Sequence, residues 1–222
     1  MSAFEDLRAH FRAIRTLARG VTGGLTEDVA GDDPTVMFNR WLEDAAASGL
    51  LLPESGALAT VTADGAPSVR MVLLKGADAR GFRFFTNYES RKAGELAANP
   101  RAALCFHWAV LERQVRVEGP VERLAHDESE AYFRTRSRGS QLGAWASAQS
   151  RPLTRRDDLV RRVVEIDRRF EGRDVPLPDH WGGYLLRPER IEFWQGRANR
   201  LHDRLLFARA PEGEWDVTRL QP

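Results

Sequence analysis

The sequence ALATVTADGAPSVRMVLLKGADARGFRFFTN (residues 57–87) alternates apolar and polar residues with a period of two, which is typical of half-buried β-strands. Asp64 and Gly65 form a strong hairpin signal, so residues 57–65 and 66–76 are expected to pair as antiparallel strands. The turn GADARG then leads into a third strand over residues 82–87. Consecutive strands joined by short turns favour an antiparallel sheet.

Patterns on either side of this segment complete an α+β, mainly β fold. Further strands are expected over 101–108, 112–124, 181–196, 200–209 and 214–222, and together they predict a closed antiparallel, Greek-key-like β-barrel. Peripheral helices are expected over 34–49, 90–99, 126–136, 140–150 and 154–172. Residues 1–33 are expected to form an amphipathic helix, with Phe4, Leu7, Phe11, Ile14 and Leu17 on one face, and a mobile arm. Residues 34–222 are then a single domain.

Composition excludes several classes of protein. The 222 residues include 33 basic and 32 acidic side chains, and this balance argues against nucleic-acid binding. No run of about 18 apolar residues predicts a membrane span, and the first residues lack an apolar signal core, so a cytoplasmic protein is expected. The single cysteine, Cys105, excludes a disulfide framework, and five scattered histidines give no metal-ligand spacing.

The distribution of cations points to anionic ligands. Lys75 and Lys92 are the two lysines of the sequence, and all the other basic residues are arginines. Arg91 and Lys92 occupy the first turn of a predicted helix, where a cation opposes the helix dipole at a cost of about 0.3–1 kcal/mol. A bound phosphate would remove that cost. Chance placement of these lysines, or a solvated Lys75, remains an alternative.

A second cationic group is expected around Tyr132 and Arg136, which are four residues apart on one helix face, with Ser140 just past the helix end. A phenol, a guanidinium and a hydroxyl that converge would suit a second phosphate, although an exposed helix face explains the spacing equally well. Gln114 would point inward between apolar strand residues and would need a partner.

The third cationic group is the strand expected over 200–209. Its alternation would place Arg200, His202 and Arg204 on one face, where they would repel one another unless an anion lay between them. A histidine there could hold a substrate group or act as an acid or base. The residues alone therefore predict a small barrel that binds phosphorylated ligands.

Six tracts together resemble the pyridoxamine 5′-phosphate oxidase family, in order and over about residues 34–222. They are RMVLLK (70–75), FFTNYESRKAGEL (84–96), ERQVRVEG (112–119), YFRTRSRGSQLGAWASAQS (132–150), WGGY (181–184) and IEFWQGRANRLHDR (191–204). The resemblance implies an FMN-binding split β-barrel and a homodimer with FMN at the subunit interface. It also implies oxidation of pyridoxamine or pyridoxine 5′-phosphate to pyridoxal 5′-phosphate. In the implied reaction, a hydride would pass from substrate C4′ to flavin N5, and O2 would then reoxidise the flavin to give H2O2.

The same resemblance implies three sets of site residues. FMN would be bound by Arg70, Met71, Val72, Leu73, Leu74, Lys75, Phe85, Thr86, Arg91, Lys92, Gln114, Gln149, Ser150, Trp194 and Arg204. The substrate phosphate would be held by Lys75, Tyr132, Arg136 and Ser140. Arg200 and His202 would lie over the substrate ring near C4′ as the catalytic pair.

The N-terminal arm departs from the family pattern, because members often carry an Arg and a Tyr shortly before GGL. This chain has Arg15 and Arg19 there, and its first tyrosine is Tyr88. Two alternatives therefore stay open. One is a related FMN-dependent oxidase acting on a phenazine-type substrate, against which Lys75 argues, since such relatives tend to lack it. The other is a non-catalytic protein that binds FMN or pyridoxal phosphate, against which Arg200 and His202 argue.

Overall fold

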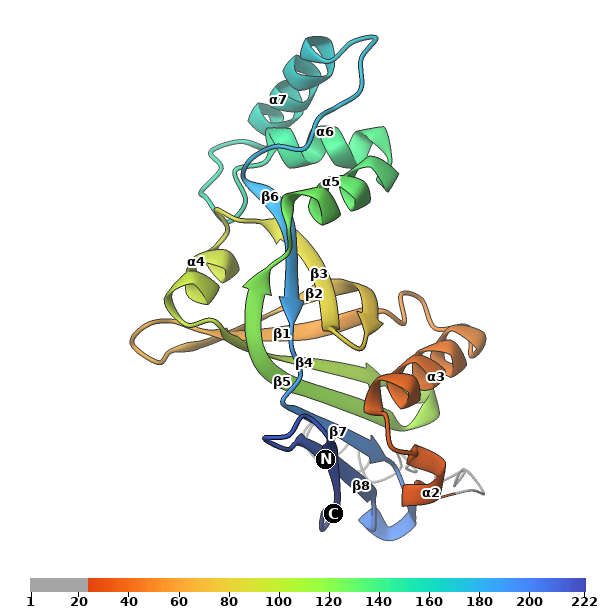
Figure 1. The fold of residues 1–222 in the computed structure, drawn as a ribbon. Helices are drawn as coiled ribbons and strands as arrows, with labels where there is room; N and C mark the ends of the chain where they lie inside the picture. The colour runs from red at the N-terminus through yellow and green to blue at the C-terminus, as the bar shows by residue number, and fades with distance from the viewer. Residues whose placement is uncertain (1–23) are drawn as a thin grey trace, which may run out of the picture. The chain divides into compact units, whose positions relative to one another are not determined.

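The computed structural model describes residues 24–222 (Figure 1). The chain divides into two compact units. The first contains the described residues up to Leu51, together with His107–Arg116 and Arg190–Pro222. The second contains Leu52–Phe106 and Val117–Glu189. The expected helix over residues 4–17 lies outside the described residues, and the expected domain boundary at residue 34 stays a prediction.

The second unit is built on a closed barrel. The sheet order β4-β1-β2-β3-β6-β5, with an additional β4–β5 pairing, closes six strands into a ring. The strands are β1 (Ser55–Val61), β2 (Pro67–Asp78), β3 (Gly81–Asn87), β4 (Arg101–Trp108), β5 (Arg113–Arg123) and β6 (Trp181–Leu186); the end of β4 and the start of β5 belong to the first unit. The pairs β1–β2, β1–β4, β2–β3, β3–β6 and β5–β6 are antiparallel. The predicted antiparallel barrel is confirmed.

The β1–β2 hairpin forms where the sequence predicts it. Its register runs from Ser55 opposite Leu73 to Val61 opposite Pro67. Gly65 has a φ of 89°, a left-handed conformation that glycine adopts without steric cost. Alternation also holds along β2, where Met71 is 62 % exposed and Leu74 is buried. One face of β2 is therefore packed inside the barrel, and the opposite face is available to a ligand or a partner.

Three helices of the second unit group around one apolar cluster. They are α5 (His126–Thr135), α6 (Arg138–Ala146) and α7 (Arg156–Arg169), and Figure 1 shows them together in green to teal. Phe133, Leu142 and Phe170 form part of the cluster, and Trp181 extends it from β6. The fourth helix, α4 (Arg91–Ala98), follows β3. Because α6 begins at Arg138, two residues before the expected start of this helix, Ser140 lies in its first turn.

The first unit contains α2 (Glu27–Ala30), α3 (Pro34–Ala47), β7 (Arg190–Gln195), β8 (Asp203–Arg209) and β9 (Trp215–Arg219), with the short 3-10 turns η1 (Ala109–Leu111) and η2 (Ala198–Arg200). As predicted, α3 begins at Pro34, and the Asp33 carboxylate accepts a hydrogen bond of 2.7 Å from the Thr35 N–H. The core of the first unit includes Trp41, whose ring meets the Phe193 ring edge-on at 5.3 Å. Within residues 24–222, none of the helices combines the length and apolar character needed to cross a bilayer.

Three local predictions are wrong. The single strand expected over 181–196 is two strands, β6 and β7, interrupted at 187–189, where Pro188 has no N–H to donate to a ladder. The strand expected from residue 200 begins at Asp203, because Arg200 closes η2 with a φ of 61°. The predicted loop over residues 20–33 contains the helical turn α2, where the Thr26 hydroxyl accepts a hydrogen bond from the Val29 N–H.

Candidate functional site

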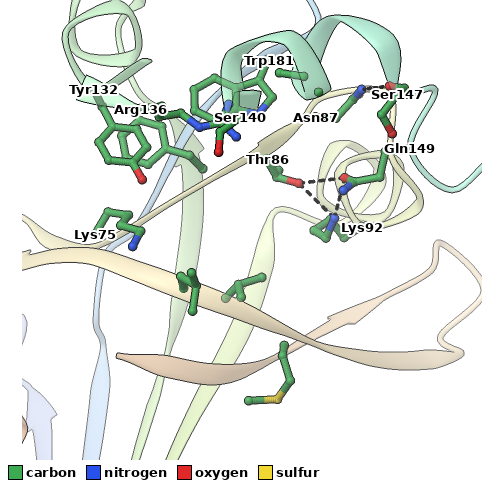
Figure 2. A pocket seen from close by; sticks show the side chains of 16 residues that line it. Lys75, Thr86, Asn87, Lys92, Tyr132, Arg136, Ser140, Ser147, Gln149 and Trp181 are labelled. Carbon is green, nitrogen blue, oxygen red and sulfur yellow. Dashed lines mark hydrogen bonds between the residues drawn. The ribbon is translucent and has the colours of Figure 1, made fainter. Parts of the chain in front are cut away.

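A cavity of about 480 Å³ lies in the second unit, and none of its sixteen lining residues is acidic (Figure 2). Its walls come from β2, β3, α4, α5, α6, the segment after α6, and β6. The lining residues are Met71, Val72, Leu73, Lys75, Phe85, Thr86, Asn87, Lys92, Tyr132, Arg136, Ser140, Gly143, Ala144, Ser147, Gln149 and Trp181. Cations without lining acids give this cavity the character of an anion-binding site.

Lys92 forms one cationic part of the cavity. Its ammonium donates hydrogen bonds to Thr86 Oγ1 at 2.9 Å and Gln149 Oε1 at 3.0 Å (Figure 2), and to Ser90 Oγ at 3.3 Å. Lys92 is 9 % exposed, and all three acceptors are neutral. Burial lowers the pKa of Lys92, the charge of Arg70 lowers it further, and Glu95 raises it. An anion placed against Lys92 would stabilise its charged form.

Arg136 forms a second cationic part. Its guanidinium lies over the Trp181 ring at 4.5 Å and over the Phe133 ring at 5.5 Å. In the part of the chain that the structure describes, Arg136 Nη1 is the one buried side-chain nitrogen or oxygen without a hydrogen-bond partner. Burial lowers the pKa of Arg136, and Tyr132 raises it. A buried N–H donor without an acceptor is costly, so the site is suited to an anionic acceptor from a ligand.

Three further polar groups lie near Arg136. Tyr132 comes from α5, Ser140 from α6, and Lys75 extends from β2 toward the Tyr132 hydroxyl (Figure 2). The Lys75 ammonium has Glu54 at 3.8 Å as a distant carboxylate partner. Burial raises the pKa of Tyr132, whereas Arg136 lowers it, so the phenol keeps its proton and can donate a hydrogen bond at neutral pH. These groups together could bind one phosphate.

Stacked aromatic rings form the wall behind these groups. The Phe85 ring stacks on the Tyr132 ring at 4.0 Å with an interplanar angle of 23°, and on the Trp181 ring at 5.6 Å with an angle of 14°. A Cβ at Gly183 would lie 2.8 Å from the Phe85 ring, so a glycine in β6 allows this close approach.

Eleven of the residues expected from the sequence line the cavity: Met71, Val72, Leu73, Lys75, Phe85, Thr86, Lys92, Tyr132, Arg136, Ser140 and Gln149. Four others from the same unit, Arg70, Leu74, Arg91 and Ser150, do not line it. Leu74 is buried on the barrel side of β2, and Ser150 has a φ of 69° in the exposed segment after α6.

Arg70 and Arg91 are both held by the carboxylate of Glu95. Arg70 Nη2 lies 3.0 Å from Oε2, and Arg91 Nε lies 2.8 Å from Oε1. The hydroxyls of Ser68 and Thr60 also donate to Oε2. Arg91 in the first turn of α4 therefore has a partner one turn later within its own helix, in addition to any ligand.

The remaining expected residues, Gln114, Trp194, Arg200, His202 and Arg204, belong to the first unit. Arg200 closes η2 and His202 precedes β8, so the predicted strand face with Arg200, His202 and Arg204 is wrong, and Arg204 forms an ion pair with Glu192 at 2.8 Å. His202 packs against the Trp194 ring at 4.5 Å and accepts a hydrogen bond from the Arg197 N–H at Nδ1. That bond leaves Nε2 to carry the proton of the neutral ring. Gln114 is half-buried in β5, and Arg200 is exposed.

The sequence prediction missed five lining residues: Asn87, Gly143, Ala144, Ser147 and Trp181. Asn87 and Ser90 precede the first residue of α4 in the chain. In the structure neither side chain caps the helix: the Ser90 hydroxyl donates to Asn87 O, and the Asn87 amide donates to Ser147 O at 3.3 Å. Trp181 belongs to the WGGY tract, and its proximity to polar site residues could not be derived from its position in the sequence.

Comparison with known proteins gives consistent results. The family model for pyridoxamine 5′-phosphate oxidase matches residues 42–169, and the model for the pyridoxine 5′-phosphate oxidase C-terminal dimerisation region matches residues 181–222. The pyridoxine/pyridoxamine 5′-phosphate oxidase of Rubrobacter xylanophilus is 62 % identical over 199 residues, which cover 90 % of this chain and 91 % of that protein. The protein of the same name from Cupriavidus necator is 57 % identical over the full length of both chains.

Solved structures share the fold. PhzG from Burkholderia lata, in complex with tetrahydrophenazine-1-carboxylic acid, matches with a TM-score of 0.84 and 31 % identity over 91 % of this chain and 100 % of that one. A pyridoxamine 5′-phosphate oxidase-related FMN-binding protein from Nostoc punctiforme matches with a TM-score of 0.70 and 18 % identity over 87 % of this chain and 100 % of that one. With both family models matched and curated relatives at 57–62 % identity, the chain belongs to the pyridoxamine 5′-phosphate oxidase family.

Proposed function

We propose that this protein is an FMN-dependent oxidase that converts pyridoxamine 5′-phosphate and pyridoxine 5′-phosphate to pyridoxal 5′-phosphate, with reduction of O2 to H2O2. The observation that carries the proposal is the acid-free cavity in which Arg136 has a buried donor without an acceptor. A phosphate ester would supply that acceptor. Relatives that carry the oxidase name at 57–62 % identity support the same substrate class.

The cavity residues fit FMN. Its phosphate would be held by Lys92, Thr86 and Gln149, whose polar atoms already converge within 3.1 Å of one another. Met71, Val72 and Leu73 of β2 would hold the flavin ring, and the other residues that the resemblance assigns to FMN belong to the same proposal. When bound, FMN would supply the hydride acceptor for substrate C4′ and the redox chemistry with O2.

The second phosphate position would hold the substrate. Arg136 and Lys75 would supply charge, and Tyr132 and Ser140 would supply hydroxyl donors. Fixing the phosphate fixes the position of the pyridine ring, which converts binding energy into orientation of the C4′ carbon. Arg200 and His202 are proposed to contact the ring near C4′. The aromatic wall would shield the Arg136 guanidinium from solvent and so strengthen the electrostatic interaction of Arg136 with the phosphate.

A cytoplasmic homodimer with FMN at the subunit interface completes the proposal. The match of residues 181–222 to the dimerisation region supports two copies per assembly. A phenazine-type substrate is the second candidate, favoured by the similarity to PhzG. The cations around Tyr132 and Ser140 favour the phosphorylated vitamer, because a substrate without a phosphate leaves the buried Arg136 donor unsatisfied.

The first experiment is a visible spectrum of the purified protein, followed by addition of pyridoxine 5′-phosphate in air. A flavin spectrum and equal yields of pyridoxal 5′-phosphate and H2O2 are expected. If the protein binds flavin but does not turn over pyridoxine 5′-phosphate, the proposed cofactor is supported and the proposed substrate is contradicted. Phenazine precursors would then be the next substrates to assay.

Lys92→Ala is expected to weaken FMN binding by about tenfold to a hundredfold, because a charged hydrogen bond contributes about 1.5–3 kcal/mol. The dissociation constant is measured by quenching of FMN fluorescence on addition of apoprotein. Far-UV circular dichroism of the variant at saturating FMN controls for folding. An unchanged dissociation constant would remove Lys92 from the cofactor site.

Arg200→Ala is expected to reduce kcat by at least about tenfold, because a misoriented substrate loses rate steeply. FMN content should remain within about twofold of the wild type, since this guanidinium is assigned to the substrate. Steady-state kinetics and the flavin-to-protein absorbance ratio measure the two effects separately. An equal loss of flavin and turnover would reject the assignment.

A further inference from the structure

Arg136 differs from other arginines of the proposed site in what holds it. Arg70 and Arg91 are bound by the Glu95 carboxylate, and Arg204 is bound by Glu192. The Arg136 guanidinium instead lies against the rings of Phe133 and Trp181. Within the described chain, no ion pair or side-chain hydrogen bond of Arg136 is formed, and Nη1 is buried without a partner.

This arrangement matters because a carboxylate and a phosphate compete for the same guanidinium donors. An aromatic face attracts the cation through its quadrupole and uses none of the N–H groups. The five donors stay available in the plane of the guanidinium, where a phosphate can form two parallel hydrogen bonds. A cation held by a ring is thus positioned without being neutralised.

Trp181 is itself fixed in place. It is 8 % exposed, and its ring stacks on Phe85 at 5.6 Å and meets the Phe133 ring edge-on at 5.2 Å. It starts β6, which pairs with β3 through Asn87 opposite Trp181. The indole is therefore attached to the barrel, whereas Arg136 follows the last residue of α5. Trp181 connects the arginine to the rigid sheet.

We propose that Trp181 is a positioning residue for the substrate phosphate, whose indole face holds the Arg136 guanidinium in its binding orientation while leaving its hydrogen-bond donors free. The inference rests on the proposed function, since it assigns a phosphorylated substrate to Arg136. Trp181 acts through Arg136. The Tyr132 ring stacks on Phe85 at 4.0 Å and on Trp181 at the longer distance of 6.2 Å, so Phe85 is its nearer partner.

The test compares three single variants of the FMN-loaded protein. Trp181→Met keeps an apolar side chain but removes the aromatic face, and Trp181→Phe retains a ring. Trp145→Met is the matched control, because Trp145 packs against the same apolar cluster and has Arg169 over its ring at 5.1 Å but does not line the cavity. Trp181→Met should raise the KM for pyridoxine 5′-phosphate and the Kd for pyridoxal 5′-phosphate about tenfold, with kcat and FMN content within about threefold of wild type.

Trp181→Phe should restore most of this affinity, and Trp145→Met should leave both constants within about twofold. Equal effects of Trp181→Met and Trp145→Met would show that Trp181 contributes only to packing and would overturn the proposal. The proposal would also be overturned if Trp181→Phe bound these ligands as weakly as Trp181→Met, since the proposed role depends on the aromatic face.

A double-mutant cycle tests whether Trp181 acts through Arg136. In an Arg136→Ala background, Trp181→Met should raise the Kd for pyridoxal 5′-phosphate by less than about twofold, because the group it positions is gone. A tenfold effect that persists in that background would assign Trp181 a direct role and contradict the proposed one.

If Trp181→Met does not fold, 19F NMR of the wild-type protein tests the same inference. With 5-fluorotryptophan incorporated, the 19F resonance missing from Trp181→Phe identifies residue 181. This resonance should shift when saturating inorganic phosphate is added; no shift would contradict the coupling. The wild-type turnover assay separates the two proposals. An inactive wild type contradicts the proposed function. If the wild type is active and Trp181→Met has the same KM as the wild type, this inference alone is contradicted.

Discussion

Replacing Arg136 by glutamate is expected to raise the KM for pyridoxine 5′-phosphate by about a thousandfold, which corresponds to about 4 kcal/mol. Two effects add. The substrate phosphate loses charge-assisted hydrogen bonds, and removing one partner of a desolvated charge pair costs about 2–5 kcal/mol. The new carboxylate also repels the phosphate inside a cavity that has no acidic lining residue. FMN content should change little, because Lys92 with Thr86 and Gln149 forms a separate polar group.

Arg134→Glu provides the matched control for that charge reversal. Arg134 lies in the last turn of α5, two residues before Arg136, but its side chain is 72 % exposed and pairs with Glu130 at the surface. An exposed pair contributes at most about 1 kcal/mol, so the KM should stay within about twofold of the wild-type value. Steady-state kinetics with pyridoxine 5′-phosphate in air measures both variants. Similar KM values for Arg136→Glu and wild type would exclude Arg136 from the phosphate site.

The β1–β2–β3 part of the barrel could be predicted from the sequence because these strands are consecutive in the chain and alternate apolar and polar residues. Residues 57–87 carry their own turn signals, and each hairpin pairs neighbouring segments, so period and turn chemistry suffice. Errors occurred where backbone conformation changes without a change in hydrophobic pattern. The left-handed φ of Asn199 and Arg200 moves the start of β8 to Asp203, and no periodicity argument contains that information.

The site could be predicted only in part from the sequence, and for a different reason. Residue types and the family resemblance indicated Lys92, Arg136 and their neighbours, and the structure groups eleven of the expected residues around one cavity. Sequence could not show which cations already have protein partners. Arg70 binds a carboxylate 25 positions along the chain, whereas Arg136 lies against a ring 45 positions away. Such long-range pairs follow from the closed barrel and determine which arginine keeps donors for a ligand.

The second large effect is expected at Glu95, whose carboxylate lies between Arg70 and Arg91. Burial raises the pKa of Glu95, but hydrogen bonds from Ser68, Thr60 and Arg91 and the charge of Arg70 outweigh it and hold the pKa at about 2. The Glu95 side chain is 5 % exposed and the Arg70 side chain 21 %, and removing one member of a largely buried ion pair costs about 3–5 kcal/mol. Glu95→Ala should therefore lower the thermal midpoint at saturating FMN by about 10 °C at pH 7.

The pH dependence distinguishes loss of the charge from loss of packing. The folded-state pKa of Glu95 is below its ordinary value of 4.5. The contribution of Glu95 to the stability of the fold is therefore complete above about pH 4.5 and is lost as the pH falls toward about 2. The difference in thermal midpoint between wild type and Glu95→Ala should consequently narrow between pH 5 and pH 3. Glu122→Ala is the control, since Glu122 pairs with Arg187 at 2.6 Å but is half exposed, and it should cost at most about 1 kcal/mol. A Glu95→Ala deficit that is independent of pH would show that side-chain volume, and not the buried charge, stabilises this part of the barrel.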